Sequence, residues 1–93
     1  MRAMFKGHVL AQSDSTIVVE GNHYFPAESL HTDYFVASET RTTCGWKGLA
    51  HYYSILTPAG TVVDAAWYYP SPKAAAAEIT GYVAFWRGVE VVP

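Results

Sequence analysis

The sequence is short of cysteine, of charge and of long apolar runs, and each shortage excludes a class of protein. Its single cysteine, Cys44, cannot close an internal disulfide or supply the paired thiols of a CxxC zinc site. Charged residues make up only 15% of the chain, the net charge is -2 and there is no basic run. A phosphate-tracking surface for nucleic acid is therefore not expected. No apolar run approaches the ~20 residues that span a bilayer, so no membrane partner is expected either.

The usual catalytic and cofactor signatures are also missing. The sequence has no Ser-His-Asp pattern, no phosphate-binding loop and no dinucleotide fingerprint. Its four histidines, at positions 8, 23, 31 and 51, include no pair at the i, i+4 spacing of a metal-binding helix. We therefore predict no metal site and no cofactor.

The length of the chain and its first residues bear on the number of domains and on the location of the protein. A chain of 93 residues makes one domain, residues 1–93, with a limited margin of stability because a short chain buries a limited share of its surface. The start, Met1–His8, contains charges and no long apolar core, so it does not resemble a secretory signal. A soluble cytoplasmic protein is the expectation.

Aromatic residues are what the chain has in abundance. Three tryptophans, seven tyrosines and four phenylalanines give 15% aromatic content within a 51% hydrophobic composition. Because each aromatic side chain buries roughly 150–250 Å², these residues are numerous enough to build most of a core. Those left outside would form a binding surface or a subunit contact, so a homodimer is also considered.

Turn residues divide the chain into short extended segments. We expect a mainly β domain of antiparallel sheets, since short strands joined by tight turns pair with their neighbours. The N-terminal third should then be a meander of three strands, and Ser38-Glu39-Thr40 a polar loop. The expected strands are 3–6, 9–12, 17–20, 42–46, 49–56, 61–69, 82–86 and 89–92.

Two helical segments are predicted. A helical turn is expected around residues 26–30, where Pro26 suits a first helical position and Glu28 follows it. A short helix is expected around residues 72–79, with Ser71 as its cap, four consecutive alanines and Gly81 after its end.

The segments 49–56 and 61–69 should form a hairpin around a turn at Pro58-Ala59-Gly60. Alternation places His51, Tyr53 and Ile55 on one face of the first strand. On the return strand it places Val63, Ala65, Trp67 and Tyr69 together.

An aromatic-lined pocket is the favoured functional hypothesis, with an unknown small molecule as partner. The rings would form a cage for a flat or cationic small ligand by stacking and cation–π contact. Lys47 follows Trp46 and precedes Gly48, and it is expected to contact a polar or anionic group of the ligand. Glu20 or Asn22 would add a hydrogen bond, and Cys44 would lie at the edge. A core position is the simpler interpretation for many of the rings. The predicted lining residues are Trp46, Tyr53, Trp67 and Tyr69.

Two other functions stay open. In an enzyme acting on a small metabolite or nucleotide, Cys44 would be a nucleophile or Lys47 an acid or base. The simpler interpretation of Cys44 is a small buried apolar residue. In a structural module, exposed aromatic residues would pair two copies of the chain.

Four motifs in order resemble domain-of-unknown-function family 427 over nearly the whole chain. They are Val19-Glu20-Gly21-Asn22-His23-Tyr24-Phe25-Pro26, Thr43-Cys44-Gly45-Trp46-Lys47-Gly48 through Tyr53, Ala65-Ala66-Trp67-Tyr68-Tyr69-Pro70 and Val83-Ala84-Phe85-Trp86-Arg87-Gly88-Val89. The resemblance implies a bacterial protein with a β-tent fold, in which two antiparallel sheets meet at an angle. Other β-tent domains hold small cyclic ligands in aromatic cages. The family also carries a label for nucleotidyltransferase activity.

Two departures from the family pattern bear on these expectations. Gly45 stands where members often have proline, which loosens the loop that carries Trp46 and Lys47. The four-cysteine zinc site of many β-tent relatives has no counterpart in a chain with one cysteine, so a metal role by analogy is rejected. The clustered carboxylates and phosphate-binding loop of nucleotidyl transfer are not apparent either.

Overall fold

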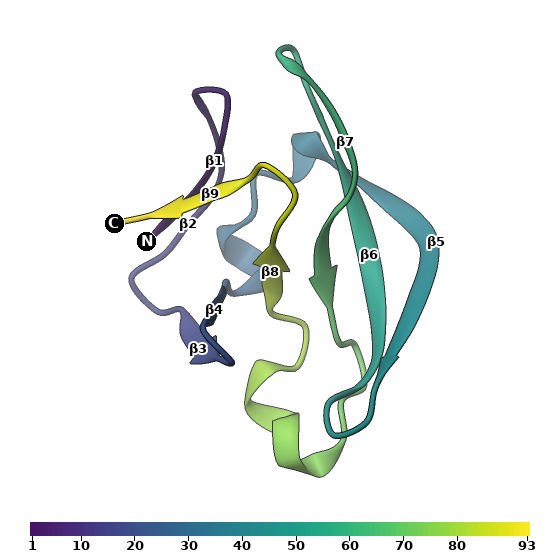
Figure 1. The fold of residues 1–93 in the computed structure, drawn as a ribbon. Helices are drawn as coiled ribbons and strands as arrows, with labels where there is room; N and C mark the ends of the chain where they lie inside the picture. Colours follow the sequence, from purple (N-terminus) through teal and green to yellow (C-terminus); the bar gives the residue numbers. More distant parts are fainter.

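Nine strands form three antiparallel sheets in the computed structural model, which describes all residues 1–93 (Figure 1). The sheets have the strand orders β2-β1-β9, β3-β4 and β5-β6-β7-β8. The prediction of a mainly β domain of antiparallel sheets is therefore confirmed. The strands are β1 (Arg2–Phe5), β2 (His8–Gln12), β3 (Ile17–Val19), β4 (Asn22–Tyr24), β5 (Phe35–Cys44), β6 (Gly48–Thr57), β7 (Gly60–Tyr68), β8 (Val83–Phe85) and β9 (Glu90–Val92).

The three-stranded sheet joins the two ends of the chain. β1 pairs with both β2 and β9, so the N- and C-termini lie side by side in Figure 1. The expected three-strand meander is wrong, because β3 pairs with β4 in a separate hairpin. The outer edge of β2 is taken instead by the segment around Leu30, where the His31 amide donates to the Leu10 carbonyl at 2.7 Å.

The four-stranded sheet is built on two long hairpins. β5 is longer than predicted, since the expected polar loop at 38–40 lies within it at a break in the pairing between Ala37 and Arg41. The β6–β7 turn is a two-residue turn, because Thr57 already pairs with Gly60. The pairing of β6 with β7 has a second break at Ser54, between Tyr53 and Ile55.

Three short 3-10 helices complete the fold: η1 (Ala27–Ser29), η2 (Thr32–Tyr34) and η3 (Ala74–Ile79). The short helix and the helical turn are thus found where they were expected. The predicted cap is not formed, since η3 follows Lys73 and no side chain caps it. Ala76 interrupts η3 with φ −117° and ψ 19°. None of these helices is long and apolar enough to cross a membrane.

The core consists of two clusters. The larger cluster includes Phe5, Leu10 and Phe25 and draws residues from both the three-stranded and the four-stranded sheet. The second cluster is rich in tyrosine and includes two residues of η3. The candidate site adjoins this second cluster, whose buried members are Tyr24, Ala50, Tyr52, Tyr69, Ala76, Ile79 and Ala84.

Candidate functional site

The loop between β5 and β6 is held against the segment that precedes η3. Cys44 pairs with Gly48 across the hairpin, and Gly48 has a φ of 118°, which L side chains rarely adopt. The Lys73 amide donates to the Lys47 carbonyl at 2.9 Å, and the Lys73 ammonium donates to the Gly45 carbonyl at 2.7 Å. These contacts fix the backbone that carries Trp46 and Lys47.

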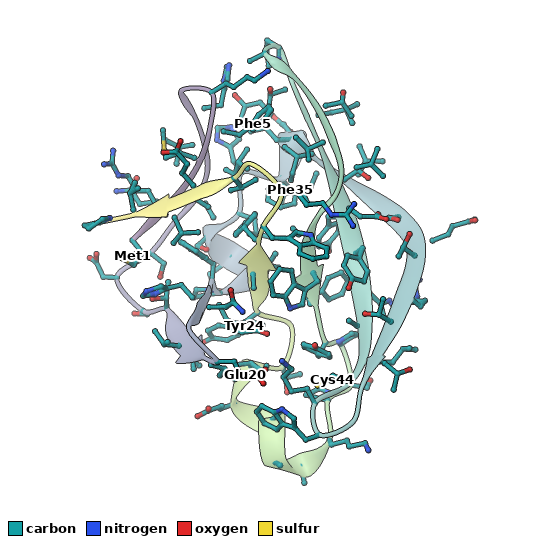
Figure 2. All side chains as sticks on the ribbon, viewed as in Figure 1. Met1, Phe5, Glu20, Tyr24, Phe35 and Cys44 are labelled. Carbon is teal, nitrogen blue, oxygen red and sulfur yellow. The ribbon has the colours of Figure 1, made fainter.

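Lys47 is the only buried charged residue, with 7% of its surface exposed. Its ammonium forms an ion pair with the carboxylate of Glu20, which sits in the β3–β4 turn. Figure 2 shows Glu20 beside the loop that follows Cys44. The Lys47 Nζ also lies 5.4 Å from the centre of the Trp46 ring and 5.6 Å from that of Tyr69, within the range of cation–π attraction.

The ion pair keeps both partners charged. Burial lowers the pKa of Lys47, but the hydrogen bond to Glu20 and nearby tyrosines outweigh it and raise that pKa to about 12. The hydrogen bond from Lys47 lowers the pKa of Glu20, against a smaller opposing effect of desolvation. The ammonium therefore presents a permanent positive charge at neutral pH.

Beside Lys47 lies a cavity of about 170 Å³ with four aromatic walls. Tyr52 and Trp67 are cross-strand neighbours on β6 and β7, and Trp67 meets Trp86 edge-on at a centroid distance of 5.7 Å. Trp86 is 42% exposed and follows β8. Lys47 supplies the one charge. The full lining is Lys47, Tyr52, Trp67, Tyr69 and Trp86.

Most polar atoms of the aromatic walls already have partners. The Trp67 indole donates to the Tyr24 hydroxyl at 3.1 Å, and the Trp86 indole donates to the Asp64 carbonyl. The Tyr52 hydroxyl shares a hydrogen bond with Thr42.

Tyr69 differs from the other walls. It is the most buried of the four, with 4% of its surface exposed, and the Lys47 ammonium lies 5.6 Å from the centre of its ring. Burial raises the pKa of Tyr69 to about 12, although the charge of Lys47 acts in the opposite direction. The one charged residue of the lining is thus Lys47, whose ammonium is paired with Glu20.

The structure brings together part of the residue set that the sequence suggested. Lys47, Trp67 and Tyr69 line the cavity. Trp46 lies over the Lys47 ammonium, 40% exposed and outside the lining. Asn22 is half-buried on β4, where it pairs with Val19.

Tyr53 lies on the other face of the sheet. It stacks on Tyr68 at 4.7 Å and packs edge-on against Phe35. The physical reason is the length of the β6–β7 turn. A three-residue turn would have set Tyr53 on the face of Trp67, but the two-residue turn sets Tyr52 there, since a shift of one residue moves a side chain to the opposite face.

Tyr52 and Trp86 are the lining residues that the sequence analysis did not assign to the site. The turn Thr57-Pro58-Ala59-Gly60 could have predicted the position of Tyr52. With two residues in the turn, even-numbered residues of β6 pair with odd-numbered residues of β7, so Tyr52 shares a face with Trp67. Trp86 reaches the cavity from β8, and no local pattern in the sequence indicates that long-range pairing.

Cys44 is half-buried against the tyrosine-rich cluster and does not line the cavity. Desolvation raises the pKa of its thiol, but the backbone N–H groups of Lys47 and Trp46 and the charge of Lys47 together lower it below its ordinary value.

A second, larger hollow of about 390 Å³ lies between β2 and the η1–η2 segment. Its walls include Gln12, His31 and Asp33 and no aromatic ring other than that histidine. No group of three His, Cys, Asp or Glu side chains in the molecule is placed to hold a metal ion. The hollow therefore lacks both the stacking surfaces and the buried charge that mark the cavity beside Lys47.

Fold and site together define a small antiparallel β domain with an aromatic cavity beside a buried lysine. The chain belongs to the NTP_transf_9 family, described as a domain of unknown function (DUF427), whose family profile matches residues 1–92. The resemblance seen in the four sequence motifs is thereby confirmed. A comparison with curated proteins found no match.

Proposed function

We propose that this domain is a non-enzymatic module that binds a small cyclic or aromatic molecule in the cavity beside Lys47. The observation that carries the proposal is the combination of a cavity of about 170 Å³, four aromatic walls and a buried ammonium. Ligand sites are typically apolar concavities with a few convergent polar groups.

The space between the walls of the cavity suits about one ring. A cavity of roughly 150 Å³ lined by apolar side chains holds benzene, and this one is only slightly larger. A nucleoside triphosphate would place most of its atoms outside the walls. The family's label for nucleotidyl transfer gains no support from the cavity for this reason.

Two tryptophans make a matched test of the site. Trp86 lines the cavity and is 42% exposed, whereas Trp46 is 40% exposed and does not line it. Thermal unfolding of the wild type should shift upward with millimolar benzamide, benzoate or succinimide, since a ligand of the native state stabilises it by mass action. Trp86→Ala should weaken binding about fivefold through the lost stacking surface, and Trp46→Ala should change it less. Equal weakening in both variants, or no shift with any ring, contradicts the proposal.

Pairing of two copies of the chain is a second candidate function, and it is favoured by the exposed edge strand β5. β5 is a ten-residue edge strand of the four-stranded sheet, and most of it is exposed. An open edge can pair with the same edge of a second copy. Light scattering tests this: a dimeric mass that Val36→Pro abolishes supports pairing through β5, and a monomeric mass at all concentrations contradicts it.

A further inference from the structure

The ion pair between Glu20 and Lys47 joins a residue of the cavity lining to one outside it. Lys47 reaches the cavity from the β5–β6 loop, whereas Glu20 comes from the β3–β4 turn and does not line the cavity. The Glu20 side chain is 52% exposed and the Lys47 side chain only 9%. One partner of the ion pair is thus fixed within the protein, and the other lies at the surface.

Such a pair is readily exchanged for another carboxylate. Ion pairs with a solvent-exposed partner contribute little, because water competes for the exposed charge and the long side chain must be held in one conformation. A displaced Glu20 carboxylate is simply hydrated. The buried Lys47 ammonium, in contrast, still requires an anionic partner.

The charge of the cavity lining favours a ligand with a negative charge. Lys47 is the only charged residue of the lining, and a lysine ammonium has three donors and no acceptor. The indole N–H groups of Trp67 and Trp86 are already bonded to protein oxygens. A cationic ligand would meet the like charge of Lys47 at short range, although the aromatic walls alone would suit it.

We propose that the site takes a planar single-ring carboxylate, and that the ligand's carboxylate displaces Glu20 from Lys47 as the ring enters between the aromatic walls. The inference rests on the proposed ligand-binding function and adds the charge of the ligand and the role of Glu20. In this account Glu20 is a built-in competitor for the anion site and contacts no ligand atom.

Three probes that share a benzene ring and differ in charge test this proposal. They are benzoate, which is an anion, benzamide, which is neutral, and benzylamine, which is a cation. Their dissociation constants are measured by calorimetry for the wild type, Glu20→Gln and the control Glu28→Gln. Glu28 is exposed on η1 and has no contact with Lys47. Both variants change the net charge equally, so a long-range effect of charge is common to them.

The expected result is a tightening of benzoate binding in Glu20→Gln by about two- to fivefold, the range that an ion pair with an exposed partner allows. Glu28→Gln should bind benzoate as the wild type does. Benzamide should bind all three proteins alike, and benzylamine should bind more weakly than benzamide. Thermal unfolding of each variant checks that it is folded.

Other outcomes separate this inference from the proposed function. Weaker benzoate binding in Glu20→Gln, or binding of benzylamine in preference to benzoate, overturns the displacement and the charge assignment while leaving a ring-binding cavity. Equal binding of benzoate and benzamide with no effect of Glu20→Gln does the same. Failure of all three probes to bind the folded wild type overturns both proposals.

Discussion

Lys47 is the residue on which the candidate site depends. It is 7% exposed, paired with Glu20 and within reach of two aromatic rings. The cavity beside it, with four aromatic walls, is the feature on which the proposed role of this charge in ligand binding rests.

The reactivity of the Cys44 thiol depends in part on the charge of Lys47. The thiol's pKa lies below its ordinary value of 9.0, partly because of Lys47. The rate of alkylation by iodoacetamide should therefore rise with pH to a plateau with a midpoint below 9.0. Lys47→Met should move that midpoint upward, and the distant Lys6→Met should not. Complete resistance of the folded protein to alkylation, or an unchanged midpoint in Lys47→Met, contradicts this account.

Single residues also show what the sequence could and could not predict about the site. Lys47, Trp67 and Tyr69 were recognised from their motifs. The sequence analysis placed Tyr53 in the site in place of Tyr52, because an error of one residue in the length of a turn moves every side chain of the strand to the opposite face. The pairing of Glu20 with Lys47 joins residues 27 positions apart, and a long-range contact of this kind follows from packing and not from local pattern.

At the scale of elements, the β5–β6 loop depends on its contact with the segment before η3. A Cβ on Gly48 would lie 3.5 Å from the Lys73 amide nitrogen and the Pro72 Cα, and its φ of 118° is unfavourable for any L side chain. Gly45, three residues earlier, has open space around it. The two glycines therefore differ in role although they lie in one loop.

The pair makes a matched test of this element. Gly48→Ala should destabilise the protein by about 1–3 kcal/mol, the cost of holding a non-glycine residue in a rarely populated backbone region. Gly45→Ala should leave the free energy of unfolding nearly unchanged or raise it slightly, since it restricts the unfolded chain without strain. Urea unfolding measures both. Similar losses in the two variants would mean that the loop is not fixed through Gly48.

The strands were easier to predict than their partners. Gly7 and Gly21 mark the ends of the β1–β2 and β3–β4 hairpins, with φ values of 82° and 79°. Gly88, with a φ of 89°, marks the turn at which the chain passes from β8 to β9 in another sheet. Pairing of β3 with β4 was missed because the edge of β2 is occupied by a later segment. The helix at 74–79 is of the 3-10 type despite its alanines, since the Tyr69–Thr80 bridge and the burial of Ala76 and Ile79 constrain a short connection.

At the scale of the whole molecule, the ionisable groups predict the pH range of stability. Lys47 and Tyr69 have pKa values raised to about 12 in the folded state. A group whose pKa is raised on folding stabilises the protein below its unfolded pKa and ceases to do so as the pH passes the folded pKa. Glu20 and Asp64 have lowered pKa values, so their contribution is present above the ordinary values of these groups, 4.5 and 3.8, and disappears in acid.

The free energy of unfolding should therefore be nearly constant between about pH 6 and 9 with respect to these groups and should fall as the pH rises from about 10 toward 12. Lys47 contributes to that fall because its pKa is raised from 10.5 to about 12 in the folded state. Lys47→Met should show a smaller alkaline loss than the wild type in urea unfolding. An equal loss in both proteins would contradict the burial and pairing of this ammonium.

Binding of a small ring in the aromatic cavity beside Lys47 can be tested by locating the ligand on the protein. The three tryptophans give three indole N–H signals in a nitrogen-15 NMR spectrum, and two of them, Trp67 and Trp86, line the cavity. On titration with benzoate we expect saturable shifts of these two signals and of the Lys47 amide, with Gln12 and His31 of the larger hollow unaffected. Shifts confined to that hollow, or none that saturate, would contradict the account.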